Sequence, residues 1–331
     1  MPLLDGQNPA QVLQAARLLA QGDLLAFPTE TVYGLGARAD DDRAVAAIFA
    51  AKGRPAEHPL IAHVTGVDAA QAFAADWPAA AQALTARFWP GPLTVIVPRR
   101  PAIGAACAGG QGSIGLRCPN HPVALVLLRE ARALGVAGVA GPSANRFGRV
   151  SPTCAAHVVD EFGPALAVLD GGPCPVGIES AIVDCTADVP ALLRPGTLGR
   201  DELESALRAA GIAGLGARNA ASPRASGTLA SHYAPRAAVH LASAALLPEA
   251  VRQARAAATG PVGVYSRVDP RLGVGVVHRA MPADPARVAR ELFAVLRGFD
   301  AQAACQIWVE APGPGGAWEG VRDRLERAAT R

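Results

Sequence analysis

A short polar loop near the N-terminus carries the first side chains that could do chemistry. Residues 28–36, PTETVYGLG, place two threonine hydroxyls, the Glu30 carboxylate and the Tyr33 phenol within a few positions. The loop follows the apolar run LLAF at 24–27, which is typical of a buried strand, and loops at the carboxyl ends of strands bind ligands in open α/β sheets. By composition alone, this loop fits a structural turn as well as a ligand site.

Two cations follow at the end of a predicted helix. Lys52 is the only lysine among the 331 residues, and it lies two residues before Arg54. The plain interpretation is a pair of cations that interacts favourably with the helix dipole at its C-terminus. The alternative is a cradle for a polyphosphate, with lysine as a compact charge and arginine as a two-pronged donor. Because Gly53 follows Lys52, the Gly-Lys-Ser/Thr signature of a P-loop is absent.

Further polar side chains stand at the ends of apolar segments. They are His58, His63, Arg117, Ser143, Asn145, Ser151, Ser180 and Arg194. A lone histidine is more often a structural hydrogen-bonding group than a catalyst. The lysine and the three arginines of these loops outnumber the neighbouring acids, Glu30 and Glu179, which favours an anionic ligand of several charges, such as ATP beside a substrate with an α-carboxylate.

The segment GPSAN at 141–145 suggests a different chemistry. It resembles half of a G-x-S-x-G nucleophile elbow, with Ser143 as the nucleophile. Asn145 stands in place of the second glycine, which weakens a hydrolase interpretation. A Ser/Lys hydrolase, which would need a serine beside Lys52, stays an alternative.

The segments between these loops alternate in the manner of an α/β domain. Asn8 and Pro9 precede a periodic stretch that stops at Gly22, which predicts a capped helix. The other helices before residue 210 are expected at 41–51, 68–75, 79–88, 121–134, 153–162 and 199–209. Strands are expected at 24–27, 60–64, 93–97, 138–141, 166–170 and 180–185. This alternation predicts an α/β domain over residues 1–210.

Beyond residue 210 the pattern changes. Residues 211–236 lack periodicity and are rich in Gly, Ala and Ser, which is typical of a linker. A second alternation over residues 237–331 predicts a smaller α/β domain. Its strands are expected at 237–242, 262–266, 273–278 and 305–310, and its helices near 245–258, 285–298 and 318–329. It holds no G-x-G-x-x-G, so the sequence assigns it no cofactor.

Composition and charge exclude several classes of protein. The net charge is +3, residues 1–210 sum to −3, and no segment has the dense basic face of an obligate nucleic-acid binder. The six cysteines form no C-x-x-C pair and the N-terminus lacks a signal-peptide pattern, which indicates a reducing cytoplasm. Cys154 and His157 have the spacing of half a zinc site without a second half, so no metal ligands are expected. The apolar runs are far shorter than the ~18 residues of a membrane span, so no membrane contact is expected.

Ten motifs, in order along the chain, form a family pattern. They are FPTETVYGLG at 27–36, AKGRP at 51–55, HPLIAHV at 58–64, FWPGPLTVIV at 88–97, GLRCPNHP at 115–122, GPSAN at 141–145, SPT at 151–153, IESAIVD at 178–184, LLRPG at 192–196 and SHYAP at 231–235. Together they resemble the threonylcarbamoyl-AMP synthase family of the YrdC type, in its longer form with a linker and an extra C-terminal domain. The last ~95 residues match that form only in length and α/β pattern.

The resemblance implies a nucleotidyltransferase that makes L-threonylcarbamoyl-adenylate and pyrophosphate from ATP, L-threonine and bicarbonate, with Mg²⁺ accompanying the ATP. Separate proteins would then use the adenylate to modify the adenosine next to the anticodon of tRNAs (t6A), and a weak direct RNA contact is a further expectation. It also implies a twisted mixed sheet with helices and a positively charged cavity, followed by a smaller Rossmann-like α/β domain.

The family match also implies roles for individual residues. Lys52 and Arg54 would act on the nucleotide phosphates as the catalytic cations, and the other residues implied at ATP are His58, Ser113, Ser143, Ser151, Arg194 and Tyr233, the last as part of a lid. The residues implied at threonine are Thr31, His63, Arg117 and Ser180, with Arg117 as a bidentate partner of its carboxylate. A carbamate facing a triphosphate opposes two anions, so fixed cations and a metal suit this chemistry better than a covalent nucleophile.

Two further functions fit parts of the pattern. One alternative is a module that handles carbamoyl-adenylate. The linker argues against it, as does the absence of fused maturation domains. An RNA-binding module is another, and it would need phosphate-contacting cations and a steep salt dependence. The negative sum of residues 1–210 argues against it.

Overall fold

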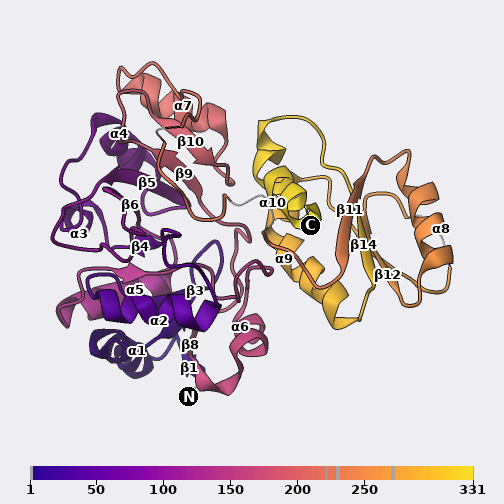
Figure 1. The fold of residues 1–331 in the computed structure, drawn as a ribbon, viewed down its shortest axis with the longest axis horizontal. Coiled ribbons are helices and arrows are strands. Elements are labelled where there is room, and N and C mark those ends of the chain that lie inside the picture. Colours follow the sequence, from indigo (N-terminus) through magenta and orange to yellow (C-terminus); the bar gives the residue numbers. More distant parts are fainter. Residues whose placement is uncertain (1–2, 221, 229–231, 270–272, 331) are drawn as a thin grey trace. The chain divides into compact units, whose positions relative to one another are not determined.

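The computed structural model describes residues 3–220, 222–228, 232–269 and 273–330, which form two compact units (Figure 1). The first unit comprises the described residues of Met1–Phe147, Pro152–Pro175 and Glu179–Thr228. The second comprises those of Gly148–Ser151, Val176–Ile178 and Leu229–Arg331. The part of the predicted linker before residue 229 thus belongs to the first unit, and Ser231 of the SHYAP segment lies outside the described residues.

A mixed sheet forms the centre of the first unit. Its described strands lie in the order β1-β8-β2-β3-β7-β4-β6-β5-β9-β10. They are β1 (Leu3–Asp5), β2 (Leu25–Phe27), β3 (Gly34–Arg38), β4 (Ile61–His63), β5 (Leu93–Pro98), β6 (Ser113–Arg117), β7 (Val139–Ala140), β8 (Ala167–Asp170), β9 (Ala181–Asp184) and β10 (Ala191–Arg194). β4 runs parallel to β6 and β5 parallel to β9, whereas β5 and β6 are antiparallel. The mixed sheet predicted for this part of the chain is confirmed.

Seven α-helices are described in the first unit. They are α1 (Pro9–Gln21), α2 (Asp42–Lys52), α3 (Val67–Ala70), α4 (Ala79–Phe88), α5 (Pro122–Ala133), α6 (Ala155–Phe162) and α7 (Arg200–Ala209). The predicted caps of α1 are present, because Asn8 accepts a hydrogen bond from the Ala10 amide and Gly22 is left-handed at φ 89°. The helix predicted over 68–75 is wrong in its length. It ends early because Ala74 pairs with Arg99 in an isolated β-bridge.

Apolar side chains cover both faces of the sheet. Leu25 and Phe27 belong to a cluster in which α1 packs against α5, whereas Ala26 between them belongs to a second cluster with α2, α4 and α7. This division follows from the alternation of side chains along a strand. The packed core holds the strand ends, and therefore the polar loops, in fixed positions.

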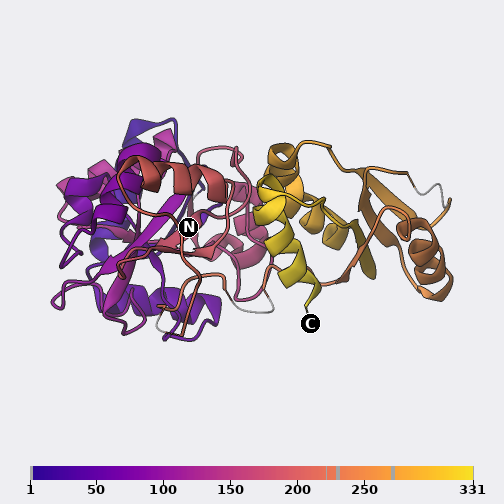
Figure 2. The ribbon, with the colours of Figure 1, turned by 90° about the horizontal axis from the view of Figure 1, so that it is seen from above.

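The second unit is a parallel α/β domain. Its sheet has the order β11-β14-β12-β13, with all neighbouring strands parallel. The elements are β11 (Ala238–Ala242), α8 (Leu247–Ala257), β12 (Val262–Ser266), β13 (Val276–Ala280), α9 (Pro285–Ala301), β14 (Gln306–Glu310) and α10 (Glu319–Ala329). Figures 1 and 2 show α8 on one face of this sheet and α9 with α10 on the other. The Rossmann-like domain predicted after the linker is confirmed.

None of the helices in the described ranges is long and apolar enough to cross a membrane.

Candidate active site

Lys52 is held at the end of α2 by the GPSAN loop that follows β7. The helix stops at Gly53, whose left-handed conformation (φ 62°) suits glycine. The Lys52 Nζ atom is buried and donates to the carbonyl oxygen of Ser143 at 2.5 Å and to that of Asn145. Burial, and then the nearby charge of Arg54, lower the pKa of Lys52 well below its ordinary value. An anion bound beside this amine would raise the pKa again.

The contact between Lys52 and Ser143 uses the backbone of the serine. A Ser/Lys hydrolase needs the serine hydroxyl beside the amine, so this geometry does not fit that alternative. The GPSAN loop is tied in turn to the polar loop at 28–36, because the Ala144 amide donates to the carbonyl oxygen of Tyr33 at 2.8 Å. The two loops therefore lie side by side at one edge of the sheet.

Tyr33 anchors the polar loop. Its phenol donates to the Gly172 carbonyl oxygen at 2.8 Å and to the Asp170 carboxylate at 3.1 Å. Burial raises the pKa of this phenol. Tyr33 thus fixes the loop to the end of β8, and the structure gives it a positioning role.

Arg54 and Arg194 meet at a residue of the predicted linker. Arg54 Nη2 donates to the carbonyl oxygen of Pro59 at 2.9 Å and to the hydroxyl of Ser226 at 3.3 Å. Arg194 Nη1 donates to the backbone carbonyl oxygen of Ser226 at 2.9 Å. The Ser226 hydroxyl itself donates to Pro59 at 2.6 Å. Two cations implied at the phosphates are therefore neighbours, and a linker serine bridges them.

Arg117 and Thr31 are brought into direct contact. The buried Arg117 guanidinium donates from Nη1 to the Thr31 hydroxyl at 2.8 Å and from Nε to the Gly91 carbonyl oxygen at 3.3 Å. Its Nη2 lies 2.7 Å from Oε1 of Glu30. The polar loop and the end of β6 thus form one charged cluster.

His63 lies beside Arg117 because β4 and β6 are parallel neighbours with these two residues in register. Its ring packs edge-on against Phe27, with 5.5 Å between ring centres. Burial, and then the charge of Arg117, lower the pKa of His63 to about 3. The ring is therefore neutral near pH 7 and adds no charge to the cluster.

Ser180 connects the two groups of residues. Its hydroxyl lies 2.8 Å from that of Thr94 and accepts from Nη2 of Arg194 at 3.2 Å. Nε of Arg194 donates to the Ser180 carbonyl oxygen at 3.0 Å. A residue implied at threonine thus contacts a residue implied at the phosphates.

His58 and Ser113 lie at the margins of the site. The His58 ring packs against Phe147 at 5.5 Å between ring centres, and the Arg54 guanidinium lies 5.8 Å from the centre of the same Phe147 ring. Burial, and then Arg54, lower the pKa of His58. Ser113 begins β6 and lines a narrow cavity together with Ser226. Both residues are thus close to the bridge between the arginines.

Ser151 and Tyr233 belong to the second unit. Tyr233 has a left-handed backbone at φ 61°. Its ring stacks on that of Phe293, with 5.5 Å between ring centres, and the Arg324 guanidinium lies 5.3 Å from the centre of the Tyr233 ring. The carbonyl oxygen of the buried Ser151 accepts from Arg297 at 3.5 Å. The other predicted site residues lie in the first unit.

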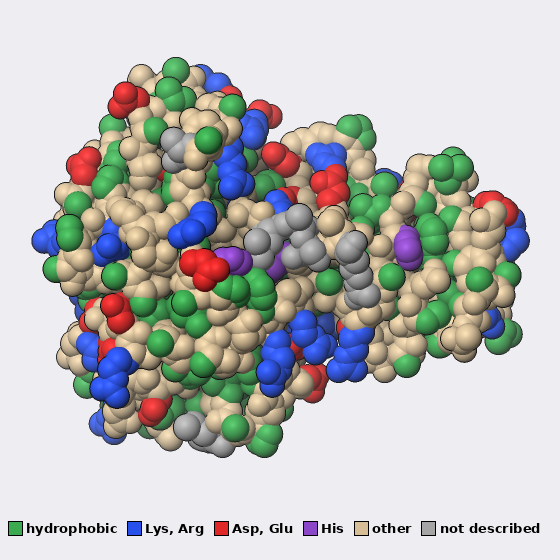
Figure 3. Space-filling view, in the orientation of Figure 1, with side chains coloured by type: hydrophobic (Ala, Val, Ile, Leu, Met, Phe, Trp, Pro, Cys, Tyr) green, Lys and Arg blue, Asp and Glu red, His purple; other side chains and the backbone are tan. Residues whose placement is uncertain are grey.

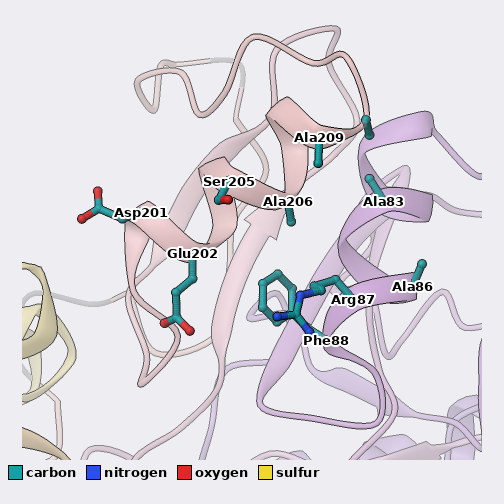
Figure 4. Close-up of a pocket in the computed structure, with 10 residues that line it drawn as sticks. Ala83, Ala86, Arg87, Phe88, Asp201, Glu202, Ser205, Ala206 and Ala209 are labelled. Carbon is teal, nitrogen blue, oxygen red and sulfur yellow. The ribbon is translucent and has the colours of Figure 1, made fainter.

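Two features outside the predicted site bear on ligand binding. In the described part of the chain, no group of three or more His, Cys, Asp or Glu side chains could hold a metal ion. A pocket between α4 and α7, with a volume of about 660 Å³, contains none of the predicted site residues. Figure 4 shows Arg87 and Phe88 of α4 lying between these two helices.

The surface of the first unit carries charges of both signs. On the face drawn in Figure 3, basic and acidic side chains are interspersed over this unit.

Three residues of the cluster had no predicted role. Glu30 belongs to the polar loop at 28–36 but receives no role from the motif pattern, although its place between two threonines is a usable signal. Thr94 stands out as a hydroxyl inside the apolar strand LTVIV. Ser226 lies in a segment without periodicity, so no sequence signal pointed to it.

Comparisons with known proteins cover both units. Residues 17–196 match the Sua5/YciO/YrdC family, described as "Telomere recombination", and residues 198–330 match the C-terminal domain of threonylcarbamoyl-AMP synthase. The threonylcarbamoyl-AMP synthase of Bacillus subtilis is 36% identical over 97% of this chain and 94% of its own length. That of Pyrococcus abyssi is 35% identical over 95% and 93%, respectively.

Solved structures give the same result. The crystal structure of P. abyssi Sua5 complexed with L-threonine has a TM-score of 0.86 at 33% identity, and covers 97% of this chain and 95% of that one. A variant of P. abyssi Sua5 with a histidine and a tyrosine replaced by alanine has a TM-score of 0.89 at 32% identity, and covers 99% and 96%. The chain therefore belongs to the threonylcarbamoyl-AMP synthase family of nucleotidyltransferase-type enzymes.

Proposed function

We propose that this chain synthesises L-threonylcarbamoyl-AMP and pyrophosphate from L-threonine, bicarbonate and ATP, for the t6A modification of tRNA. The observation that carries the proposal is the contact of Arg194 with Ser180, which joins the residues implied at the phosphates to those implied at the amino acid. Full-length relatives named for this product support it. So does the L-threonine complex of P. abyssi Sua5.

The reaction sets the demands on the site. L-Threonine and bicarbonate form a carbamate with loss of water and a proton, and one oxygen of the carbamate then attacks the α-phosphorus while pyrophosphate leaves. Both reactants are anions, so the site must hold them together with fixed positive charge. No covalent enzyme intermediate is needed, since the carbamate is itself the nucleophile.

Three cations would hold the triphosphate. Lys52 uses two of its N–H groups on carbonyl oxygens, which leaves one for a phosphate oxygen. Arg54 and Arg194 are neighbours through Ser226. Their guanidinium groups can each bind a phosphate in bidentate fashion. Ser143, Ser113 and His58 would contact the rest of the nucleotide.

The amino acid would bind at the Arg117 cluster. Arg117 would take the carboxylate, and the hydroxyls of Thr31 and Ser180 can donate to or accept from the threonine hydroxyl or carboxylate. His63 would contribute a neutral ring, because its pKa is lowered to about 3. A neutral ring avoids repulsion of the substrate ammonium.

Mg²⁺ is proposed to enter with ATP. This ion keeps several waters and is bound largely through substrate phosphates. Glu161 and Glu179 lie near enough to Lys52 that their negative charges oppose the lowering of its pKa. The bound ion would neutralise charge on the departing pyrophosphate.

Ser151 and Tyr233 stay predicted nucleotide contacts, as the family resemblance implies. A mixed anhydride hydrolyses readily, so a lid that excludes water would protect the product. Separate proteins would then carry the threonylcarbamoyl group to tRNA.

Product analysis tests the proposal. The full chain is given ATP, Mg²⁺ and bicarbonate, with and without L-threonine, and pyrophosphate and the adenylate are quantified. We expect pyrophosphate to appear only with threonine. Pyrophosphate formed equally without threonine would reject the proposal.

A further inference from the structure

Glu30 is a buried carboxylate to which the mechanism above gives no task. It follows β2 and is 3% exposed. Thr29 fixes the loop around it, because its hydroxyl donates to the Val32 carbonyl oxygen at 2.6 Å and accepts from the amides of Thr31 and Val32 at 3.2 Å each. These hydrogen bonds join the residues before and after Glu30, so the backbone of Glu30 is held in one conformation.

The two oxygens of Glu30 differ in their surroundings. Oε1 forms the 2.7 Å ion pair with Arg117. Oε2 is shielded from solvent and has no hydrogen-bond donor among the described residues. Buried carboxylate oxygens are normally satisfied by donors, since burial without a partner costs free energy. A ligand that brings a cationic N–H group would supply that partner.

Arg117 has donors left for a ligand as well. Its hydrogen bonds and ion pair use Nε on Gly91, Nη1 on Thr31 and Nη2 on Glu30. Each terminal nitrogen carries two N–H groups, so one remains on each. Two such donors match the two oxygens of a carboxylate.

Two histidines and two cysteines near this pair carry no charge near pH 7. Burial lowers the pKa of His63 to about 3 and also lowers that of His121. Burial raises the pKa of Cys118 to about 11 and raises that of Cys174. Glu30 therefore supplies the negative charge of the cluster and Arg117 the positive one.

An α-amino acid carries the complementary charges on a single carbon. We propose that Glu30 binds the α-ammonium group of the amino acid substrate through Oε2, while Arg117 binds the α-carboxylate. This inference rests on the proposed function, which places the amino acid at Arg117. The nitrogen of this ammonium forms the carbamate after it has lost a proton, so Glu30 orients the reacting atom before that step. It also makes the site select α-amino acids over α-hydroxy acids.

A ligand without the amine separates this role from a structural one. The variant Glu30→Gln keeps the size of the side chain and removes its charge. Binding of L-threonine and of 2,3-dihydroxybutanoate, in which a hydroxyl replaces the amine, is measured on the full chain for parent and variant. We expect the Kd for threonine to rise roughly tenfold or more, as for loss of a hydrogen bond to a charged group. The Kd for the hydroxy acid should stay within about threefold, since its hydroxyl carries no positive charge to pair with Glu30.

Two further variants keep the test decisive. Glu310→Gln removes another buried glutamate paired with an arginine, Arg267 of the second unit, and should leave the preference for threonine unchanged. If Glu30→Gln does not fold, Glu30→Asp keeps the charge but withdraws it by one methylene. In that variant the KM for threonine should rise while the KM for ATP stays unchanged.

Equal weakening of both ligands by Glu30→Gln would overturn the inference, because Glu30 would then act only by holding Arg117. A rise in both KM values for Glu30→Asp would overturn it in the same way. A parent chain without threonine-dependent pyrophosphate release would instead reject the proposed function.

Discussion

Replacing Lys52 with methionine removes the ammonium at the end of α2 and leaves a side chain of similar length. In the parent, two N–H groups of Lys52 are used on the carbonyl oxygens of Ser143 and Asn145, so one is available to a phosphate. One hydrogen bond between charged groups is worth roughly 1.5–3 kcal/mol, which corresponds to a fall in kcat/KM for ATP of about 10- to 150-fold.

The fold should survive the change. Burial already disfavours the charge of Lys52, as its lowered pKa indicates, so removing the charge relieves a desolvation cost. Two carbonyl oxygens lose a donor, at about 1–3 kcal/mol each, which opposes that gain. Melting curves of parent and variant check this.

The assay is threonine-dependent pyrophosphate release at varied ATP. Arg87→Met, which removes a cation from α4 outside the site, is the matched control and should behave as the parent. A folded Lys52→Met variant whose kcat/KM stays within about threefold of the parent would refute the phosphate role.

Further outcomes follow from Lys52, His63 and Ser226. Binding of ATP should be accompanied by proton uptake, because the phosphates raise the pKa of Lys52 that burial has lowered. Calorimetry in buffers of different ionisation enthalpy measures the number of protons taken up. The absence of proton uptake would contradict the phosphate contact of Lys52. At pH values between the lowered pKa of Lys52 and its ordinary value of ~10.4, the unfolded chain binds more protons at Lys52 than the folded chain does. The free energy of unfolding should therefore rise more steeply with pH in the parent than in the Lys52→Met variant. His63 should stay neutral from pH 5 to 8 because its pKa is lowered to about 3, so its NMR signals, assigned by comparison with His63→Gln, should not shift there. The stabilisation from its neutral ring should be lost as pH falls from ~6.5 toward that value, and a midpoint near 6.5 in the folded chain would contradict this. Ser226→Ala removes the hydrogen bonds of this hydroxyl to Pro59 and Arg54, so tryptic cleavage after Arg224 should become about fivefold faster. The control Ser222→Ala should be cleaved at the rate of the parent. Equal cleavage rates in both variants would argue that the Ser226 hydroxyl does not hold this segment in place.

Much of the fold followed from local signals. The helices that became α1 and α2 carry capping residues and glycine stops, which act within a few residues and are visible in the sequence. β3 was hidden in the loop at 28–36, because its residues Gly34–Arg38 include two glycines and lack an apolar alternation. The short β1 and β10 gave too few positions for a periodic pattern.

The candidate site was less accessible to sequence reasoning. Motifs could name Lys52, Arg117 and His63, but the contact of Lys52 with backbone oxygens and the register of His63 with Arg117 depend on how strands pair. Ser226 reaches Arg54 and Arg194 across long sequence separations. Such contacts arise from the tertiary fold and leave no local trace.

A crystal structure of the full chain with L-threonine and a non-hydrolysable ATP analogue tests most directly whether one site holds both substrates. We expect phosphate oxygens within hydrogen-bonding distance of Lys52 and the two arginines that meet at Ser226, with the threonine carboxylate on Arg117. Threonine bound away from Arg117, or phosphates bound away from Lys52, would contradict that assignment.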